Sequence, residues 1–152
     1  MIIALIAVIL AVGVPFWLSR RYVIVTVEGR SMEPGYREGD RLVVRRARGE
    51  AVRRGQVVVF RDDLDDSRSQ PGGADLPAEL PPGVSPWILK RAVAVRGDPV
   101  PRLATLEGES RVPRGRLVVM GDNAAHSFDS RHFGYLPADR VLGVVRRVMA
   151  AR

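Results

Sequence analysis

The sequence predicts an all-β domain, mostly antiparallel with coiled or closed sheets, preceded by one N-terminal transmembrane helix. Three observations carry this prediction. An uncharged apolar run opens the chain from Ile2 to Leu18. Short runs rich in β-branched residues, separated by turns that contain glycine, follow from Tyr22 onward. No stretch after the apolar run keeps a helical period, so strands are expected to form the rest of the chain.

The apolar run is predicted to be a membrane anchor. Its seventeen residues would span roughly 25 Å as a helix, the short end for a bilayer crossing. Arg20 and Arg21 end the run, and Trp17 is placed as an interfacial anchor. A cleaved secretory signal is the alternative, but the run lacks a basic segment before it and a small-residue cleavage site before the arginines. We therefore expect an uncleaved anchor over 1–19 and a β-rich domain over 20–152.

Six runs behind the anchor are predicted to be strands. They are Tyr22–Val27, Arg41–Arg45, Gln56–Phe60, Ile88–Val95, Arg116–Met120 and Val141–Val148. Glycine-containing pairs such as Gly39-Asp40 and Gly97-Asp98 mark turns between them. The segment 61–86 is different, because it combines five aspartates with many prolines and glycines. Such a composition buries little surface, and the segment is predicted to be a flexible surface loop.

Composition narrows the function classes. A net charge of +7 makes a polyanionic partner worth testing. A nucleic-acid binder would gather its charge on one stripe with stacking aromatics, whereas here the arginines are scattered and aromatics make up 6%. We expect no nucleic acid, and a basic surface against anionic lipid headgroups instead. The chain has no cysteine and only two histidines, His126 and His132, so no catalytic thiol and no metal centre are predicted.

The single lysine stands out. Lysine and arginine together number 24, and Lys90 is the only lysine among them. Arginine does not give up its proton in a protein, whereas a desolvated lysine can. Chance survival of one lysine in an arginine-biased composition is the plain alternative. The apolar neighbours of Lys90, among them Trp87, Ile88 and Leu89, favour a lysine held as a neutral amine.

A serine in a tight turn is the second candidate catalytic residue. Ser31 follows the first predicted strand within Gly29-Arg30-Ser31-Met32-Glu33-Pro34, where Pro34 prevents a long helix. A lone serine in such a place is most often a turn or capping residue. Two other segments change this interpretation, namely Lys90-Arg91-Ala92-Val93 and Gly121-Asp122-Asn123 followed by Ser127-Phe128-Asp129-Ser130-Arg131.

Together these three segments resemble the bacterial type I signal peptidases, membrane-bound serine proteases with a Ser–Lys dyad. The resemblance covers residues 1 to 145. It implies that Ser31 is the nucleophile and Lys90 the general base, with no metal or organic cofactor. It also implies that Ser127 hydrogen-bonds and orients the Lys90 amine. In the same way it predicts two ion pairs, one between Asp129 and Arg131 and the other between Asp122 and Arg91.

The resemblance also implies how the substrate is held. Substrates of the family carry small residues at the first and third positions before the cut. The walls of these shallow pockets align with Val27, Met32, Tyr36, Ile88 and Leu89, for any one of which core packing is the plainer interpretation. The Ser31 N–H is the natural donor to the oxyanion. Some relatives add a hydroxyl two residues before the nucleophile, where this chain has Gly29, and the residue after Gly-Asp-Asn is Ala124 instead of the usual arginine.

Other functions compete with this one. A Ser–His–Asp arrangement could use His126 or His132 with Asp122 or Asp129, but no Gly-x-Ser-x-Gly elbow is present. A related Ser–Lys maturation protease dedicated to one partner protein keeps the same dyad and is the main alternative. A self-cleaving repressor would need a DNA-binding half and no apolar run. A membrane-tethered β-module that binds lipid or a secretion partner would leave Lys90 without a role.

The expected location follows the resemblance. It implies a single-pass protein in the plasma membrane of a bacterium, with the domain outside and exported preproteins as substrates. The positive-inside rule points the other way, because the flanking arginines come after the apolar run. We follow the resemblance, since a signal peptidase facing inward would meet no substrate.

Overall fold

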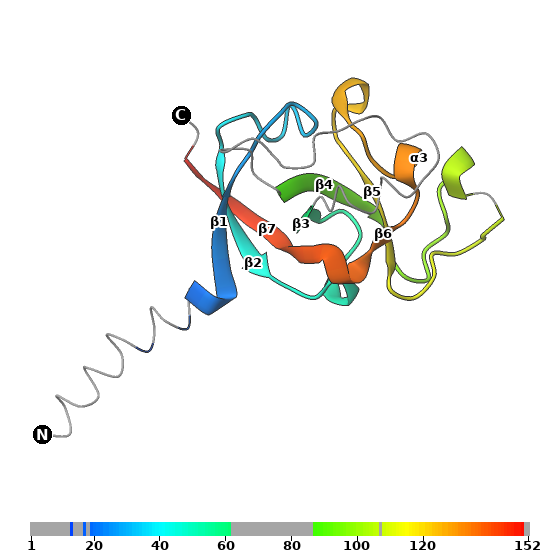
Figure 1. Ribbon diagram of the computed structural model, residues 1–152, viewed down its shortest axis with the longest axis horizontal. Coiled ribbons are helices and arrows are strands. Elements are labelled where there is room, and N and C mark those ends of the chain that lie inside the picture. The colour runs from blue at the N-terminus through cyan, green and yellow to red at the C-terminus, as the bar shows by residue number, and fades with distance from the viewer. Residues whose placement is uncertain (1–12, 14–16, 18, 62–86, 107, 151–152) are drawn as a thin grey trace, which may run out of the picture.

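Seven strands pair into one antiparallel sheet in the computed structural model (Figure 1), which describes residues 13, 17, 19–61, 87–106 and 108–150. The strands are β1 Tyr22–Thr26, β2 Arg41–Arg46, β3 Val57–Arg61, β4 Trp87–Ala94, β5 Arg116–Met120, β6 Leu136–Pro137 and β7 Val141–Ala150. Their spatial order is β1-β2-β7-β3-β4-β5-β6, and every paired strand is antiparallel. The prediction of a mostly antiparallel β domain is therefore confirmed. In the described part of the chain the order has two ends, β1 and β6, so strand pairing does not close the sheet.

The helices among the described residues are short. The α-helix α3 covers Ser130–Phe133, and residues 13, 17 and 19–21 are also helical. Four single turns of 3-10 helix lie between strands: η1 Gly49–Ala51, η2 Ala104–Leu106, η3 Ala124–His126 and η4 Ala138–Arg140. None of these described helices has the length and hydropathy to cross a membrane. The predicted anchor lies almost wholly outside the described residues, as do positions 62–86 of the predicted loop. Arg61, the first residue assigned to that loop, is instead the last residue of β3.

The central strand shows why the sequence patterns predicted the fold well. β3 is the fourth of seven strands in the sheet, and its residues Val57 to Phe60 are all buried. A strand covered on both faces needs an apolar run, and not the alternation of a half-exposed strand. The β-branched side chains of this run suit a pleated, packed surface. The predicted strand boundaries differ from the observed ones by two residues at most.

One strand, β6, was not predicted from the sequence. β6 contains only two residues, Leu136 and Pro137. Proline has no N–H to give to a ladder and is confined to sheet edges, which is where β6 lies. So short a strand has no periodicity of its own. Its pairing with Arg116 and Leu117 of β5 depends on the tertiary structure.

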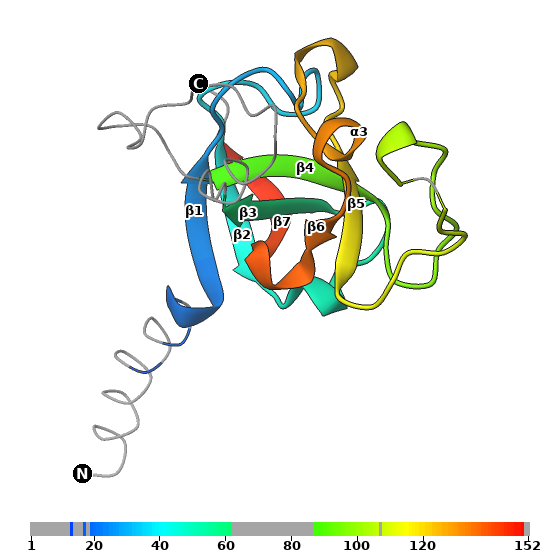
Figure 2. The same cartoon turned by 45° about the vertical axis from the view of Figure 1, so that its right-hand side comes forward.

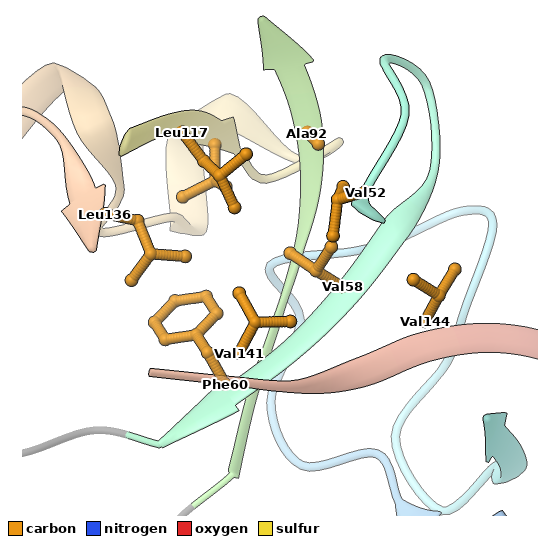
Figure 3. Packing of buried hydrophobic residues seen from close by; sticks show 9 residues of the cluster. Val52, Val58, Phe60, Ala92, Leu117, Leu136, Val141 and Val144 are labelled. Atoms are coloured by element: carbon orange, nitrogen blue, oxygen red, sulfur yellow. The ribbon is translucent and has the colours of Figure 1, made fainter. Parts of the chain in front are cut away.

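Buried side chains form separate clusters on the sheet. The first is shown in Figure 3 and contains Val52, Val58, Phe60, Ala92, Leu117, Val119, Leu136, Val141 and Val144. The second contains Val25, Val27, Met32, Leu42, Val44, Val57, Val59 and Leu89. Alternate residues of a strand point to opposite faces, so Val58 belongs to the first cluster and its neighbours Val57 and Val59 to the second. The two clusters therefore pack against opposite faces of β3.

The loops at one end of the sheet lie together. The loop after β1, which carries Ser31, and the loop after β5, which carries residues 121–129, meet at the upper end of the sheet in Figure 2, close to α3. The beginning of β1 and the turns η1 and η4 lie at the opposite end (Figures 1 and 2). Segments about ninety positions apart in sequence therefore form one surface.

Candidate active site

A serine and the only lysine of the chain lie side by side. Lys90 Nζ is 2.8 Å from Ser31 Oγ, although the two residues are 59 positions apart. β4 carries Lys90 between β3 and β5, with Val58 as its cross-strand partner. Only 4% of Lys90 is exposed. A lysine in so dry a position next to a hydroxyl can exchange a proton with it when the amine is neutral.

The turn after β1 is shaped by the residues around Ser31. Tyr36 N–H donates to the Met32 carbonyl at 3.0 Å, and Gly39 N–H donates to the Val27 carbonyl at 2.9 Å. Met32, at 1% exposure, is buried in the second cluster. Ser31 is thereby presented from a turn whose next residue is anchored in the core. Gly29 has φ +77°, a conformation in which any residue with a side chain is strained.

The loop after β5 packs against this turn through Gly121. A Cβ placed on Gly121 would lie 2.2 Å from Ser127 Oγ and 2.6 Å from the Ser31 carbonyl oxygen. No other residue type fits in so small a space. The Ser127 hydroxyl therefore lies within a few ångströms of the Ser31 backbone. Its own hydrogen bond runs to Asp129 Oδ2, at 2.7 Å.

Asp129 is the centre of a buried polar network. Its side chain is fully buried and accepts hydrogen bonds from the Arg131 guanidinium at 2.8 and 2.6 Å. The Gly121 N–H and the Ser127 hydroxyl donate to the same carboxylate, at 2.9 and 2.7 Å. Burial raises the pKa of Asp129, but these donors outweigh burial and hold the pKa well below its usual range. The carboxylate is therefore charged and saturated with donors at neutral pH.

Ser130 has a different role from Ser127. It is fully buried, and its hydroxyl oxygen accepts the Val119 N–H at 2.9 Å. The hydroxyl of Thr105 donates to the Ser130 carbonyl at 2.7 Å. Ser130 thus ties α3 to β5 and η2, whereas Ser127 lies between Asp129 and the turn that carries Ser31.

The second predicted ion pair lies nearer the surface. Arg91 donates to the two carboxylate oxygens of Asp122 at 2.8 and 2.6 Å and to the Gly55 carbonyl at 2.9 Å. The hydrogen bond to Asp122 raises the pKa of Arg91, so this guanidinium keeps its charge. Asp122 also lies over Gly35, where an added Cβ would be 3.6 Å from Asp122 Oδ2. The pair joins β4 to the far side of the serine turn.

The predicted substrate-contacting residues divide between the two clusters. Val27, Met32 and Leu89 belong to the second cluster, and Tyr36 packs against it. Ile88 packs against the first cluster instead. The exposed fractions of Val27 and Leu89 are 2% and 6%. These side chains contribute to the core beside Ser31 and Lys90, and their predicted contact with substrate stays a prediction.

The two histidines have partners other than Ser31. His126 Nδ1 is 3.4 Å from Asn123 Oδ1, and His132 Nδ1 accepts the Asp129 N–H at 3.3 Å. Within the described ranges, neither ring contacts Ser31. Nor does the described chain hold three or more His, Cys, Asp or Glu side chains that could bind a metal ion. The geometry therefore favours the lysine over either histidine as the partner of Ser31.

Asn123 is the residue whose role sequence reasoning missed. Its place in Gly121-Asp122-Asn123 predicts no function of its own. Its backbone N–H donates to the Ser31 carbonyl at 3.0 Å, and its side-chain Nδ2 donates to the Arg30 carbonyl at 3.1 Å. Turn residues that bind a distant backbone leave no local pattern. The only sequence signal was the position of Asn123 within the motif.

A separate hollow of about 970 Å³ lies at the opposite end of the sheet from these loops. Its charged lining consists of Arg46, Arg48, Glu50, Arg114, Arg116, Asp139 and Arg140. None of the predicted site residues lines it. The hollow is therefore separate from the neighbouring Ser31 and Lys90 side chains.

The chain is similar to known peptidases over most of its length. Residues 101–150 match the family described as "Signal peptidase, peptidase S26", and residues 14–67 match the family described as "Peptidase S24-like". The chain is 31% identical to signal peptidase I V of Bacillus subtilis over 92% of this chain and 91% of that protein. It is 30% identical to a probable signal peptidase I-2 of Synechocystis, over 90% of this chain and 66% of that protein. A mitochondrial inner membrane protease subunit 2 of Mus musculus is 31% identical over 78% of this chain and 61% of its own length.

Proposed function

Because the chain belongs to the type I signal peptidase family, we propose that it removes signal peptides from exported preproteins with Ser31 as nucleophile and Lys90 as general base. The observation that carries the assignment of residues is the 2.8 Å separation between Lys90 Nζ and Ser31 Oγ at a lysine only 4% exposed. The reaction class is hydrolysis of a peptide bond by a serine endopeptidase. No metal or organic cofactor is part of the proposal.

The chemistry follows from the two groups. The neutral Lys90 amine takes the Ser31 proton as Ser31 Oγ attacks the scissile carbonyl. The resulting ammonium returns the proton to the leaving amine, and the acyl group stays on Ser31. Water then enters by the same route, with Lys90 again accepting a proton, and the serine is freed. The Ser31 N–H stabilises the oxyanion in both steps.

The surrounding charges support a neutral lysine. The negative charge of Asp129 is met by the Arg131 guanidinium and two further donors, and that of Asp122 by Arg91. Carboxylates paired in this way do little to stabilise the charged form of a nearby lysine. Ser127 donates its proton to Asp129, so its oxygen keeps lone pairs that an amine N–H can use. We propose that Ser127 orients Lys90 in this manner.

Substitution of the base tests the dyad. Lys90→Arg keeps the charge and cannot accept a proton, so we expect cleavage of a preprotein to fall close to the uncatalysed level in a folded protein. Ser31→Ala should do the same. His126→Ala and His132→Ala are the matched controls and should retain substantial cleavage. If a histidine substitution abolishes turnover while Lys90→Arg does not, the dyad is wrong.

The range of substrates can be tested directly. The maturation protease dedicated to one partner is not favoured, because relatives named signal peptidase I match 90 to 92% of this chain. We propose small residues at the first and third positions before the cut, with Val27, Met32, Tyr36, Ile88 and Leu89 beside those positions. Cleavage of a mixed preprotein panel after Ala-x-Ala would support this. Activity on one preprotein alone would favour the dedicated enzyme.

We further propose that residues 1–19 anchor the protein in the bacterial plasma membrane and that 20–152 lie outside. Support comes from Trp17, which is 54% exposed, and from the Arg21 guanidinium 5.0 Å from its ring centroid. Aromatic and basic side chains in this combination are typical of the headgroup region. Protease added to intact protoplasts should digest residues 22–152. Protection until lysis would instead place them in the cytoplasm, as the positive-inside rule would have it.

A further inference from the structure

Asn123 binds the carbonyls of two consecutive residues in the nucleophile turn, Arg30 and Ser31. Its side-chain Nδ2 donates to the Arg30 carbonyl at 3.1 Å, and its backbone N–H donates to the Ser31 carbonyl at 3.0 Å. The first of these bonds joins residues 93 positions apart. No other described residue outside the turn itself is seen to hold both carbonyls. Asn123 therefore holds the nucleophile turn by two hydrogen bonds that do not involve Lys90.

The peptide unit between Arg30 and Ser31 also contains the proposed oxyanion donor. In a planar trans peptide the C=O and the following N–H point in opposite directions. The Arg30 carbonyl, held by Asn123 and by the Glu33 N–H at 3.3 Å, therefore fixes the direction of the Ser31 N–H. In the described part of the chain, that N–H has no partner of its own. A carbonyl that accepts hydrogen bonds also makes the N–H of the same unit a stronger donor.

This arrangement matters because the chain has no side-chain hydroxyl two residues before the nucleophile, where some relatives have one. Gly29, two residues before the nucleophile, offers no hydroxyl, and its φ of +77° disfavours a residue that could supply one. The oxyanion then depends on a backbone N–H whose orientation is free to change in an unrestrained turn. A donor contributes to catalysis only when it is held in place before the charge develops.

We infer that Asn123 is a positioning residue for the oxyanion: its side chain locks the Arg30–Ser31 peptide so that the Ser31 N–H faces the developing negative charge. The inference rests on the proposed nucleophile, Ser31. His126 Nδ1, 3.4 Å from Asn123 Oδ1, supports the amide from the outside. With His126 Nδ1 protonated, Oδ1 accepts from the ring and Nδ2 is directed to the Arg30 carbonyl. Asn123 does not touch substrate.

The test uses the full-length protein and two probes of the site. A peptide boronic acid mimics the tetrahedral state: the Ser31 oxygen adds to boron, its proton goes to Lys90, and a boron hydroxyl occupies the oxyanion position. A peptide of the same sequence with a reduced bond at the cleavage position measures binding of the ground state. In Asn123→Asp, which keeps the side-chain shape but cannot donate, we expect kcat and boronic acid affinity to fall about 100-fold. The affinity for the reduced peptide and KM should change less than about twofold.

Matched variants separate the possible causes. Ala124→Asp places a carboxylate at the next, exposed position and keeps the amide, so both affinities should stay at the wild-type level. Asn123→Ala should reproduce the selective loss without the added charge, and it replaces Asn123→Asp if that variant fails to fold. His126→Ala should give a loss of only a few-fold. Equal losses for both probes would overturn the inference in favour of a structural role, and unchanged boronic acid affinity would overturn it outright.

Failure of the dyad would look different. If Ser31 is not the nucleophile, wild type and Ser31→Ala bind the boronic acid equally well, and this is measured before any Asn123 variant. A selective loss in Asn123→Ala, together with loss of the adduct in Ser31→Ala, supports both proposals. Retention of tight adduct in Asn123→Ala with loss in Ser31→Ala overturns the positioning role alone.

Discussion

Two arginine–carboxylate pairs flank Ser31 and Lys90 with nearly the same geometry and very different surroundings. Arg131 approaches Asp129 to 2.6 Å, and Arg91 approaches Asp122 to 2.6 Å. The Asp129 side chain is 0% exposed and that of Asp122 is 23% exposed. Contact distance alone therefore says little about what a pair contributes. When one residue of a pair is removed, the loss of stability depends on whether water can reach the charged residue that remains.

The buried pair organises its loop. The more exposed pair connects segments that strand pairing already holds together. Asp129 is also the N-cap of α3 and accepts the Gly121 N–H, so its loss would release two loops at once. Arg91 and Asp122 connect β4 to the loop after β5, which the strand pairing of β4 with β5 already holds together. The comparison predicts that equal substitutions will have unequal effects.

The largest difference should come from the arginines. Arg131→Ala leaves the Asp129 charge buried and without its main partner, and we expect the free energy of unfolding to fall by about 3 to 5 kcal/mol. Arg91→Ala, the matched variant, leaves a carboxylate that water can reach and should cost under about 1 kcal/mol. Denaturant unfolding of both proteins measures the difference. Similar losses at the two positions would show that burial does not separate these pairs.

Acid should reduce this difference. The pKa of Asp129 is lowered in the folded protein, because hydrogen bonds from Arg131, Gly121 and Ser127 outweigh the opposing effect of burial. A lowered folded pKa contributes stability that is fully present above the unfolded value, about 3.9. This contribution is lost as the pH falls below about 4 toward the folded pKa. The unfolded chains titrate alike, so the gap in unfolding free energy between wild type and Arg131→Ala should shrink as the pH falls through the folded pKa of Asp129 in Arg131→Ala. That pKa is higher than in wild type, because the carboxylate is still buried but has lost its main donor. A gap that does not change on acidification would contradict the assigned charge state.

The two buried serines should differ mainly in their effect on turnover. Ser127→Ala should lower turnover by about 100-fold or more, because it removes the proposed orientation of Lys90. It should also lower the unfolding free energy by about 1 to 3 kcal/mol, because the buried Asp129 carboxylate loses one donor. Ser130→Ala leaves the Val119 N–H without its acceptor and should cost about 1 to 3 kcal/mol of unfolding free energy, with a smaller effect on turnover. Thermal melts and preprotein cleavage measure the two effects. Small, equal losses of turnover would show that Ser127 is structural and that another group holds Lys90.

The smallest effect is expected far from the dyad. Arg114 and Glu50 form a pair of 4.0 Å at the hollow on the opposite end of the sheet, with side chains 74% and 60% exposed. Arg114→Ala should change the unfolding free energy by no more than about 0.5 kcal/mol. It should leave turnover at the wild-type level. It serves as the baseline for the other arginine variants. A large loss here would mean that net charge, and not the position of an arginine, controls stability.

Much of this molecule could be predicted because its signals are local. Runs of β-branched residues located six strands to within two residues, since a strand on a packed sheet needs such side chains wherever it lies. The rarity of lysine singled out Lys90, and the motif around Asp129 predicted its pairing with Arg131. Strand order and the two-residue β6 could not be predicted, because pairing joins segments that share no sequence pattern.

The sequence by itself determined which residues could do chemistry and which segments would be strands, since both depend on side-chain type and short-range spacing. The tertiary structure alone decided which of these residues meet. It paired the Ser127 hydroxyl with Asp129, assigned Val27, Met32 and Leu89 to the core, and brought Asn123 onto the carbonyl of Arg30. The physical reason is that hydrogen bonds and burial are properties of position in space, and a buried polar group takes whichever partner the packed backbone brings within reach.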